Sequence, residues 1–177
     1  MQNKKFTNTA LFLDRDGIIN HDFGYVYQKE KLKLVDGIID LINYFSNLVD
    51  YIIVVSNQSG IGRGYYSFDD WMNFNGEIQL KLNKSALKID AFYCCPHKPE
   101  FDPLMQCTCR KPNPGMLIAA QNEFLIDLEQ SILIGDKLSD IGAAKNAGIM
   151  RAYLLTPDDI YLSEYFPQFD ACSIMSL

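Results

Sequence analysis

The sequence predicts an α/β fold: a three-layer, Rossmann-like arrangement in which helices flank both faces of a parallel β-sheet. Two observations lead to this prediction. Short apolar segments rich in β-branched and aromatic residues alternate with longer amphipathic segments along the chain. No repeat, low-complexity tract or linker interrupts the alternation. We therefore expect a single domain over residues 1–177, with right-handed crossovers between successive strands.

The apolar segments are the predicted strands, and each ends near small, polar or acidic residues. They are residues 9–14, 50–57, 89–95, 131–136 and 150–155. The amphipathic segments between them predict helices over residues 37–48, 68–87, 114–127 and 139–147. Helix boundary signals support these assignments: Asp69 and Asp70 lie early in the second helix, "NPG" begins the third, and Gly148 follows the fourth.

Composition narrows the class of protein. The net charge of −6, with 48% hydrophobic and 21% charged residues, is typical of a globular protein and argues against a general nucleic-acid binder. No apolar run is long enough to span a bilayer, and "MQNKKFTNTA" lacks the apolar core of a signal peptide. We expect a cytoplasmic monomer without a membrane partner. In that compartment, the five cysteines indicate thiols or metal ligands before disulfides.

Carboxylates follow two of the predicted strands. Asp14 and Asp16 end the first in "DRDG", where i and i+2 side chains point the same way, and Asp136 and Asp140 follow the fourth. Carboxylates so close repel each other unless a cation lies among them, and Mg²⁺ prefers such oxygen ligands. A single aspartate at a strand end is also commonly a helix N-cap, an alternative that stays open above all for Asp140.

Groups suited to binding phosphate occur at the same predicted edge. The second strand ends in "SNQSGIGRG", where Ser56 supplies a hydroxyl, Asn57 an amide and the glycines exposed N–H groups. Lys111 adds a mobile positive charge. A glycine-rich turn alone is a weak signal. Together, the acids, the hydroxyl and the lysine indicate phosphoryl transfer, which needs a nucleophile, hydrogen-bond donors, a cation and a metal.

The loop 95–109 carries paired metal ligands. The pattern Cys95-x-His97 followed by Cys107-x-Cys109 suits a tetrahedral, structural Zn²⁺ site with no open position. A redox pair at Cys94–Cys95 or a disulfide is the alternative. Zinc would contribute on the order of 10 kcal/mol to the order of this loop.

The two residues after the last ligand are cations, Arg110 and Lys111. An ordered loop would direct both toward the active site, Lys111 as a catalytic group and Arg110 as a substrate contact.

Four motifs in order, "LFLDRDG", "IIVVSNQ", "RKP" and "ILIGDKLSD", resemble those of the haloacid dehalogenase-like phosphatases over residues 9 to about 155. The resemblance implies that Asp14 is the nucleophile and Asp16 the general acid and base. It implies that Asp14, the carbonyl of Asp16 and Asp136 hold Mg²⁺, and that Ser56 and Lys111 stabilise the transferred phosphoryl group. The chain departs from the pattern at residue 18, where Ile stands in place of the usual Thr or Val.

Further motifs, "GYVYQKEKLKLVDG" and "CPH…CxCRKPNPGM", look like the D-glycero-D-manno-heptose 1,7-bisphosphate 7-phosphatase family. This resemblance implies removal of the 7-phosphate in ADP- or GDP-heptose biosynthesis for surface glycans such as lipopolysaccharide. It also implies substrate contacts from Asp22, Phe23, Gly24, Tyr25, Asn57, Gln58, Ser59, Arg110 and Lys137.

Three alternatives remain at this point. The histidinol-phosphatase branch shares the zinc loop and the strand-end acids. A catalytically idle, zinc-stabilised binding protein could use the same fold. A DNA-end 3′-phosphatase shares the motifs, but the acidic charge disfavours it.

The spacing of the motifs leaves no room for a cap domain. Strands, helices and loops account for the residues between Asp14 and Ser56, and likewise between Ser56 and Lys111. We therefore expect a capless enzyme whose selectivity comes from the loops 20–30 and 95–110.

Overall fold

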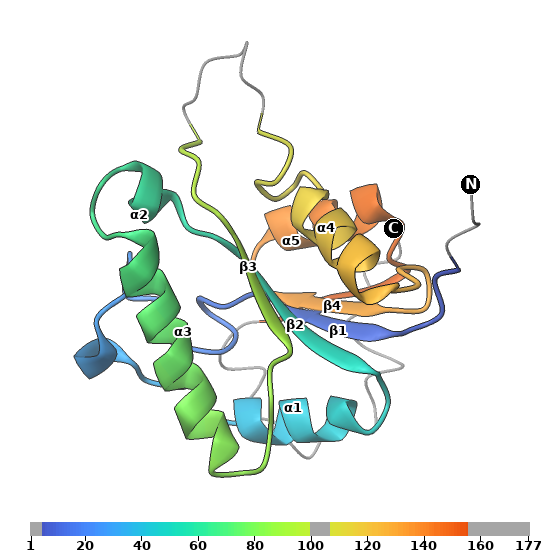
Figure 1. Ribbon diagram of the computed structural model, residues 1–177, viewed down its shortest axis with the longest axis horizontal. Helices are drawn as coiled ribbons and strands as arrows, with labels where there is room; N and C mark the ends of the chain where they lie inside the picture. The colour runs from blue at the N-terminus through green and yellow to red at the C-terminus, as the bar shows by residue number, and fades with distance from the viewer. Residues whose placement is uncertain (1–4, 100–106, 156–177) are drawn as a thin grey trace.

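A computed structural model describes residues 5–99 and 107–155 and confirms the predicted α/β alternation (Figure 1). Five parallel strands form one sheet in the order β3-β2-β1-β4-β5. The strands are β1 (Ala10–Leu13), β2 (Tyr51–Asn57), β3 (Ala91–Cys95), β4 (Ile132–Gly135) and β5 (Arg151–Leu154).

The four predicted helices are present, with two short additions. They are α1 (Ile38–Ser46), α3 (Phe68–Asn83), α4 (Gly115–Phe124) and α5 (Leu138–Ala147). The additions are a 3₁₀ turn at Lys29–Lys31 and the single-turn helix α2 (Ser59–Gly62). Helix α3 ends before residue 87, where we expected its end, because Ala86 has a left-handed φ of 57°. There the Gln79 side chain bonds the backbone of Leu87 and Ile89 instead.

Successive side chains along each strand point to opposite faces of the sheet, and helices cover both faces, which gives the three layers. On β1, Leu11 and Leu13 pack in the core that α1 and α3 cover, whereas Ala10 and Phe12 pack in the core that α4 and α5 cover. Figure 1 shows the two helix pairs on opposite faces of the sheet. Ile18, the departure from the family pattern, is fully buried in the first of these cores.

The strand register brings the motif residues to one edge. Strand β1 lies at the centre of the sheet, and its Leu13 pairs with Val54 of β2 and Ile134 of β4. The chain therefore leaves all three strands at the same edge, where the strand order reverses and open α/β sheets bind ligands. On the next strand out, Cys95 pairs with Asn57, which places the start of the cysteine loop beside that edge.

The part of the chain that the structure describes contains no cap domain inserted between these elements. The expectation of a single domain over residues 1–177 reaches beyond the described residues and stays a prediction. Of the five cysteines, Cys172 lies outside the described residues. None of the described helices is long and apolar enough to cross a membrane.

Candidate active site and metal sites

A cleft of about 210 Å³ opens at the carboxyl edge of the sheet. The sequence predicted thirteen catalytic and substrate-binding residues, and all of them except Phe23 and Arg110 line this cleft. Those that do are Asp14, Asp16, Asp22, Gly24, Tyr25, Ser56, Asn57, Gln58, Ser59, Lys111 and Lys137. Asp140 lines it as well, together with Tyr66 and Ser139, which the sequence analysis did not single out.

Lys111 lies between two carboxylates at the base of the cleft. Its Nζ is 2.7 Å from Asp14 Oδ1 and 2.5 Å from Asp140 Oδ1, and it donates to the Val55 carbonyl at 2.7 Å. Only 4% of Lys111 is exposed. Burial favours the neutral amine, but the two carboxylates outweigh it and raise the pKa of Lys111 above its ordinary value. The lysine therefore stays charged beside the predicted nucleophile.

The carboxylates of Asp14, Asp136 and Asp140 form a compact cluster, with their oxygen atoms within 4.8 Å of one another. Burial, and then the charge of Asp14, raises the pKa of Asp136 to about 6. Its Oδ1 is buried and has no hydrogen-bond partner among the described residues. An unpartnered oxygen in a cluster of acids fits a hard cation such as Mg²⁺. Gly17 has a φ of 100°, and a Cβ there would overlap the Asp136 carboxylate, so the turn needs glycine.

Asp140 contacts both the start of helix α5 and the lysine of the acid cluster. Its Oδ2 accepts the backbone N–H of Lys137 at 3.0 Å, which caps helix α5. Its Oδ1 faces Lys111. Lys137 is the N-cap residue of α5 and Asp140 the third residue of the helix, so the N-cap interpretation of Asp140 is wrong, although one oxygen of its carboxylate does cap the helix as part of a capping box.

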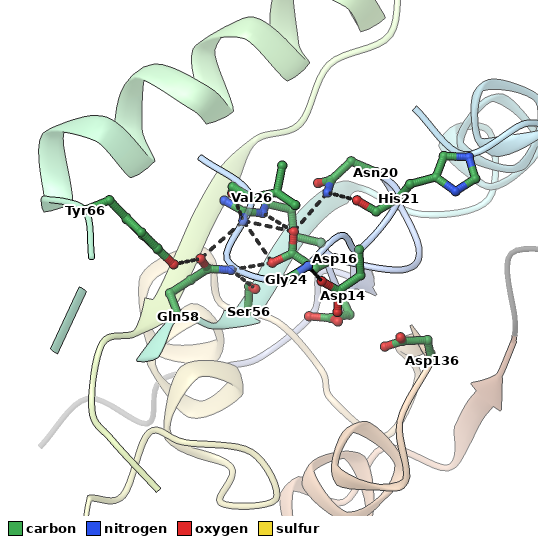
Figure 2. A network of polar contacts seen from close by, with 12 residues as sticks. Asp14, Asp16, Asn20, His21, Gly24, Val26, Ser56, Gln58, Tyr66 and Asp136 are labelled. Atoms are coloured by element: carbon green, nitrogen blue, oxygen red, sulfur yellow. Dashed lines mark hydrogen bonds and ion pairs between the residues drawn. The ribbon is translucent and has the colours of Figure 1, made fainter. Parts of the chain in front are cut away.

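The side chain of Asp16 is held by donors on three sides (Figure 2). Its Oδ1 accepts from Asn20 at 2.9 Å, its Oδ2 accepts from Gln58 at 2.7 Å, and the fully buried Arg15 bonds both oxygens. The Arg15 guanidinium also lies 4.9 Å from the centre of the Phe74 ring. These hydrogen bonds fix the orientation of the Asp16 carboxylate, which lines the cleft.

Asn57 clamps the backbone of Lys111. Its side-chain oxygen accepts the Lys111 N–H at 3.0 Å and its amide nitrogen donates to the Lys111 carbonyl at 3.1 Å. This pair of bonds ties the end of β2 to the end of the cysteine loop. The predicted substrate contact of Asn57 stays a prediction.

The four predicted zinc ligands converge. The Nδ1 of His97 lies 3.4 Å from Cys95 Sγ, 3.0 Å from Cys107 Sγ and 3.3 Å from Cys109 Sγ. All four described cysteines are free thiols, and Cys94 is not part of the cluster. Burial opposes ionisation of Cys107, but hydrogen bonds from Cys109 and from the Arg110 N–H outweigh it and lower the pKa of Cys107 to about 7. Three cysteine sulfurs and an imidazole within reach of one point fit a tetrahedral metal.

The predicted substrate cations are placed differently from each other. Arg110 donates through Nη1 to the His97 carbonyl at 3.2 Å and does not line the cleft. Lys137 does line it, with its Nζ 3.3 Å from Asp22 and 3.4 Å from Asp136. Burial opposes the charge of Lys137, but Asp136 and its neighbours raise its pKa. Phe23 is 62% exposed.

Comparison with known proteins shows the family to which this chain belongs. A family model described as HAD-hydrolase-like matches residues 108–158. The D-glycero-alpha-D-manno-heptose-1,7-bisphosphate 7-phosphatase of Burkholderia mallei is 45% identical over 155 residues, covering 86% of this chain and 82% of that protein. The corresponding beta-heptose phosphatase of Helicobacter pylori strain J99 is 43% identical, covering 87% of each.

A solved structure agrees with these relatives. The D,D-heptose 1,7-bisphosphate phosphatase of B. bronchiseptica, complexed with magnesium and phosphate, superposes with a TM-score of 0.74 and 29% identity, covering 82% of this chain and 79% of that one. The chain is thus a phosphatase, a phosphoric monoester hydrolase. Since identity above 40% extends over most of its length, the chain belongs to the heptose-1,7-bisphosphate 7-phosphatase family of the haloacid dehalogenase-like hydrolases.

Proposed function

We propose that this enzyme removes the 7-phosphate of D-glycero-D-manno-heptose 1,7-bisphosphate and leaves the anomeric phosphate in place. The observation that carries the proposal is the cleft, in which Asp14, Asp16 and Lys111 meet at the edge of a fold shared with relatives named for this reaction. The product would feed the synthesis of nucleotide-activated heptose for surface glycans.

The reaction proceeds in two steps on the side chains of the cleft. Asp14 attacks phosphorus, the bond to the sugar oxygen breaks, and Asp16 donates a proton to that oxygen. Asp16 then takes a proton from water, which attacks the aspartyl-phosphate and releases inorganic phosphate and free Asp14. Lys111 and Ser56 bind the phosphoryl oxygens where negative charge develops.

Mg²⁺ is the proposed cofactor, held by Asp14, the Asp16 carbonyl and Asp136. It would offset the repulsion between the anionic nucleophile and the anionic phosphate. The buried Asp136 oxygen without a partner and the magnesium in the B. bronchiseptica complex support this choice of metal.

Zn²⁺ is the proposed occupant of the cysteine loop, with a structural role. Arg110, directly after the last ligand, donates its N–H to Cys107 Sγ at 3.3 Å, so metal binding at the sulfurs fixes the backbone that leads into Lys111. We further propose that the enzyme is a monomer and lies in the cytoplasm, where these thiols stay reduced. Size-exclusion chromatography with light scattering tests the oligomeric state.

The substrate is tested by a phosphate-release screen. The panel contains both anomers of the heptose bisphosphate, because the relatives carry both names, together with fructose 1,6-bisphosphate and histidinol phosphate. We expect the highest kcat/KM for a heptose bisphosphate, with phosphorus NMR showing only the anomeric phosphate in the product. An equal or higher kcat/KM for histidinol phosphate, or loss of the anomeric phosphate, would overturn the proposal.

A further inference from the structure

We infer that Gln58, oriented by Tyr66 and Arg15, is a positioning residue that fixes which way the Ser56 hydroxyl donates and holds Asp16 beside it. The inference rests on the proposed function, since it concerns how phosphoryl oxygens and the proton donor are presented in the cleft. Figure 2 shows the chain of contacts from Tyr66 through Gln58 to Ser56 and Asp16. The expectation from the sequence was that Gln58 contacts substrate.

The oxygen of the Gln58 amide is identified by its partners. Arg15 Nη2 lies 3.2 Å from Oε1, and a guanidinium can only donate, so the atom facing it is the acceptor. Tyr66 Oη lies 2.6 Å from the same Oε1 and therefore donates to it. Two independent donors on one oxygen leave the amide a single orientation.

The amide nitrogen then faces two acceptors. Nε2 of Gln58 lies 2.7 Å from Asp16 Oδ2 and 2.6 Å from Ser56 Oγ. An amide nitrogen only donates, so Ser56 Oγ must accept, and its own hydrogen is left to point elsewhere. Among the described residues, no acceptor for the Ser56 hydroxyl hydrogen is recorded, and Ser56 lines the cleft. The hydroxyl is therefore set to donate to an anion in the cleft.

Packing holds this arrangement in place. Gln58 is 2% exposed and Tyr66 6%. The Tyr66 ring stacks on Tyr27 at 4.9 Å between ring centres and lies so close to Gly60 that a Cβ at Gly60 would overlap it. Burial raises the pKa of Tyr66 to about 12, so its hydroxyl keeps its proton. Turning the amide over would place its NH₂ group against the Arg15 and Tyr66 donors, which leaves buried donors without an acceptor.

Two substitutions test the inference while Asp14, Asp16, Ser56 and Lys111 stay in place. Gln58→Glu replaces the donating nitrogen with an oxygen, so the Ser56 hydroxyl bonds Glu and no longer points at phosphate. We expect kcat to fall by about 10²–10³, the usual effect of losing one transition-state donor. Tyr66→Phe removes one of two donors to Oε1, and we expect a fall of roughly fivefold in kcat, with KM within about twofold. Tyr27→Phe, which deletes a hydroxyl from the stacked neighbour outside the cleft, is the matched control and should match wild type.

A double-mutant cycle separates positioning from loss of structure. If Gln58 acts through Ser56, the factor lost on Gln58→Glu is smaller in a Ser56→Ala background than in the wild type. Melting temperatures are measured for every variant. If the factor lost in the double variant equals the product of the factors lost on Gln58→Glu and on Ser56→Ala, the inference is overturned. A Tyr66→Phe kcat indistinguishable from that of Tyr27→Phe would overturn it as well.

All variants are assayed on a small aryl phosphate as well as on the bisphosphate, with Asp14→Asn as reference. We expect equal fractional losses on both substrates, because the network acts at the transferred phosphoryl group. A wild type that hydrolyses the heptose bisphosphate as slowly as Asp14→Asn does would overturn the proposed function itself. Asp14-dependent turnover that is insensitive to Gln58 and Tyr66 would remove this inference alone.

Discussion

Replacing Lys111 with methionine would remove the one charge that lies between Asp14 and Asp140 while keeping a side chain of similar length. The ammonium contacts both carboxylates at 2.7 and 2.5 Å and donates to the Val55 carbonyl at 2.7 Å, in a position only 4% exposed. The variant therefore leaves two buried carboxylates and one carbonyl without this partner.

The expected loss of stability follows from the burial of Lys111 and its partners. Removing one member of a buried ion pair costs about 3–5 kcal/mol, and an unsatisfied carbonyl adds about 1–3 kcal/mol. The acid cluster can relieve part of this by taking up a proton, since the pKa of Asp136 is already raised to about 6. We therefore expect the free energy of unfolding to fall by about 3–5 kcal/mol at neutral pH without Mg²⁺, and by less at pH 5. The kcat should fall by about 10²–10³ because a charged transition-state donor is lost.

Urea unfolding of chelator-treated protein, followed by circular dichroism, measures the stability, and phosphate release from an aryl phosphate measures the activity. Lys145→Met on the exposed part of α5 is the control, and it should change the free energy of unfolding by no more than about 0.5 kcal/mol. A loss of less than about 1 kcal/mol for Lys111→Met would show that the lysine does not neutralise a buried acid cluster.

Three further predictions concern the metals and the substrate. In the metal-free protein, the folded state binds the Asp136 proton more tightly than the unfolded state, so the contribution of Asp136 to the free energy of unfolding falls as pH rises toward about 6. Unfolding curves of the Asp136→Asn variant should lack this dependence of stability on pH. An unchanged dependence would contradict a raised pKa at Asp136. A mild chelator should stop activity reversibly while elemental analysis still finds one zinc per chain, and Cys107→Ser should lower zinc content and kcat together; native protein free of zinc would exclude the zinc site. Arg110→Ala should lower kcat/KM for the bisphosphate far more than for an aryl phosphate; an equal loss on both would assign Arg110 to the loop, through its bond to the His97 carbonyl.

The strands and the catalytic edge could be predicted because their signals are local. An apolar run such as "LFLD" specifies a buried strand, and parallel strands carry the residues after them to one edge. The cluster of Cys95, His97, Cys107 and Cys109 could be predicted as well, because two closely spaced pairs of such ligands in one loop are typical of a metal site.

The network behind Asp16 could not be predicted in the same way. An arginine between two aspartates in "DRDG" suggests an exposed charge, yet Arg15 is fully buried, and its partners Gln58 and Val26 come from other segments. Tyr66 reaches Gln58 only because the short helix α2 folds the chain back over it. The direction of Arg110 depends on the loop carbonyl it meets, which its position in the sequence does not specify.

An Asp14 nucleophile becomes phosphorylated during turnover, and acid quenching followed by peptide mass spectrometry measures this directly. The enzyme is mixed with heptose bisphosphate, quenched within the first turnovers, and digested, and the peptide that carries "LFLDRDG" is fragmented. We predict one added phosphoryl group on Asp14 in the wild type, its accumulation in Asp16→Asn supplied with an aryl phosphate that needs no proton donor, and its absence in Asp14→Asn. Turnover with no phosphoryl group on this peptide in any of these proteins, or a phosphoryl group on a different residue, would exclude Asp14 as the nucleophile.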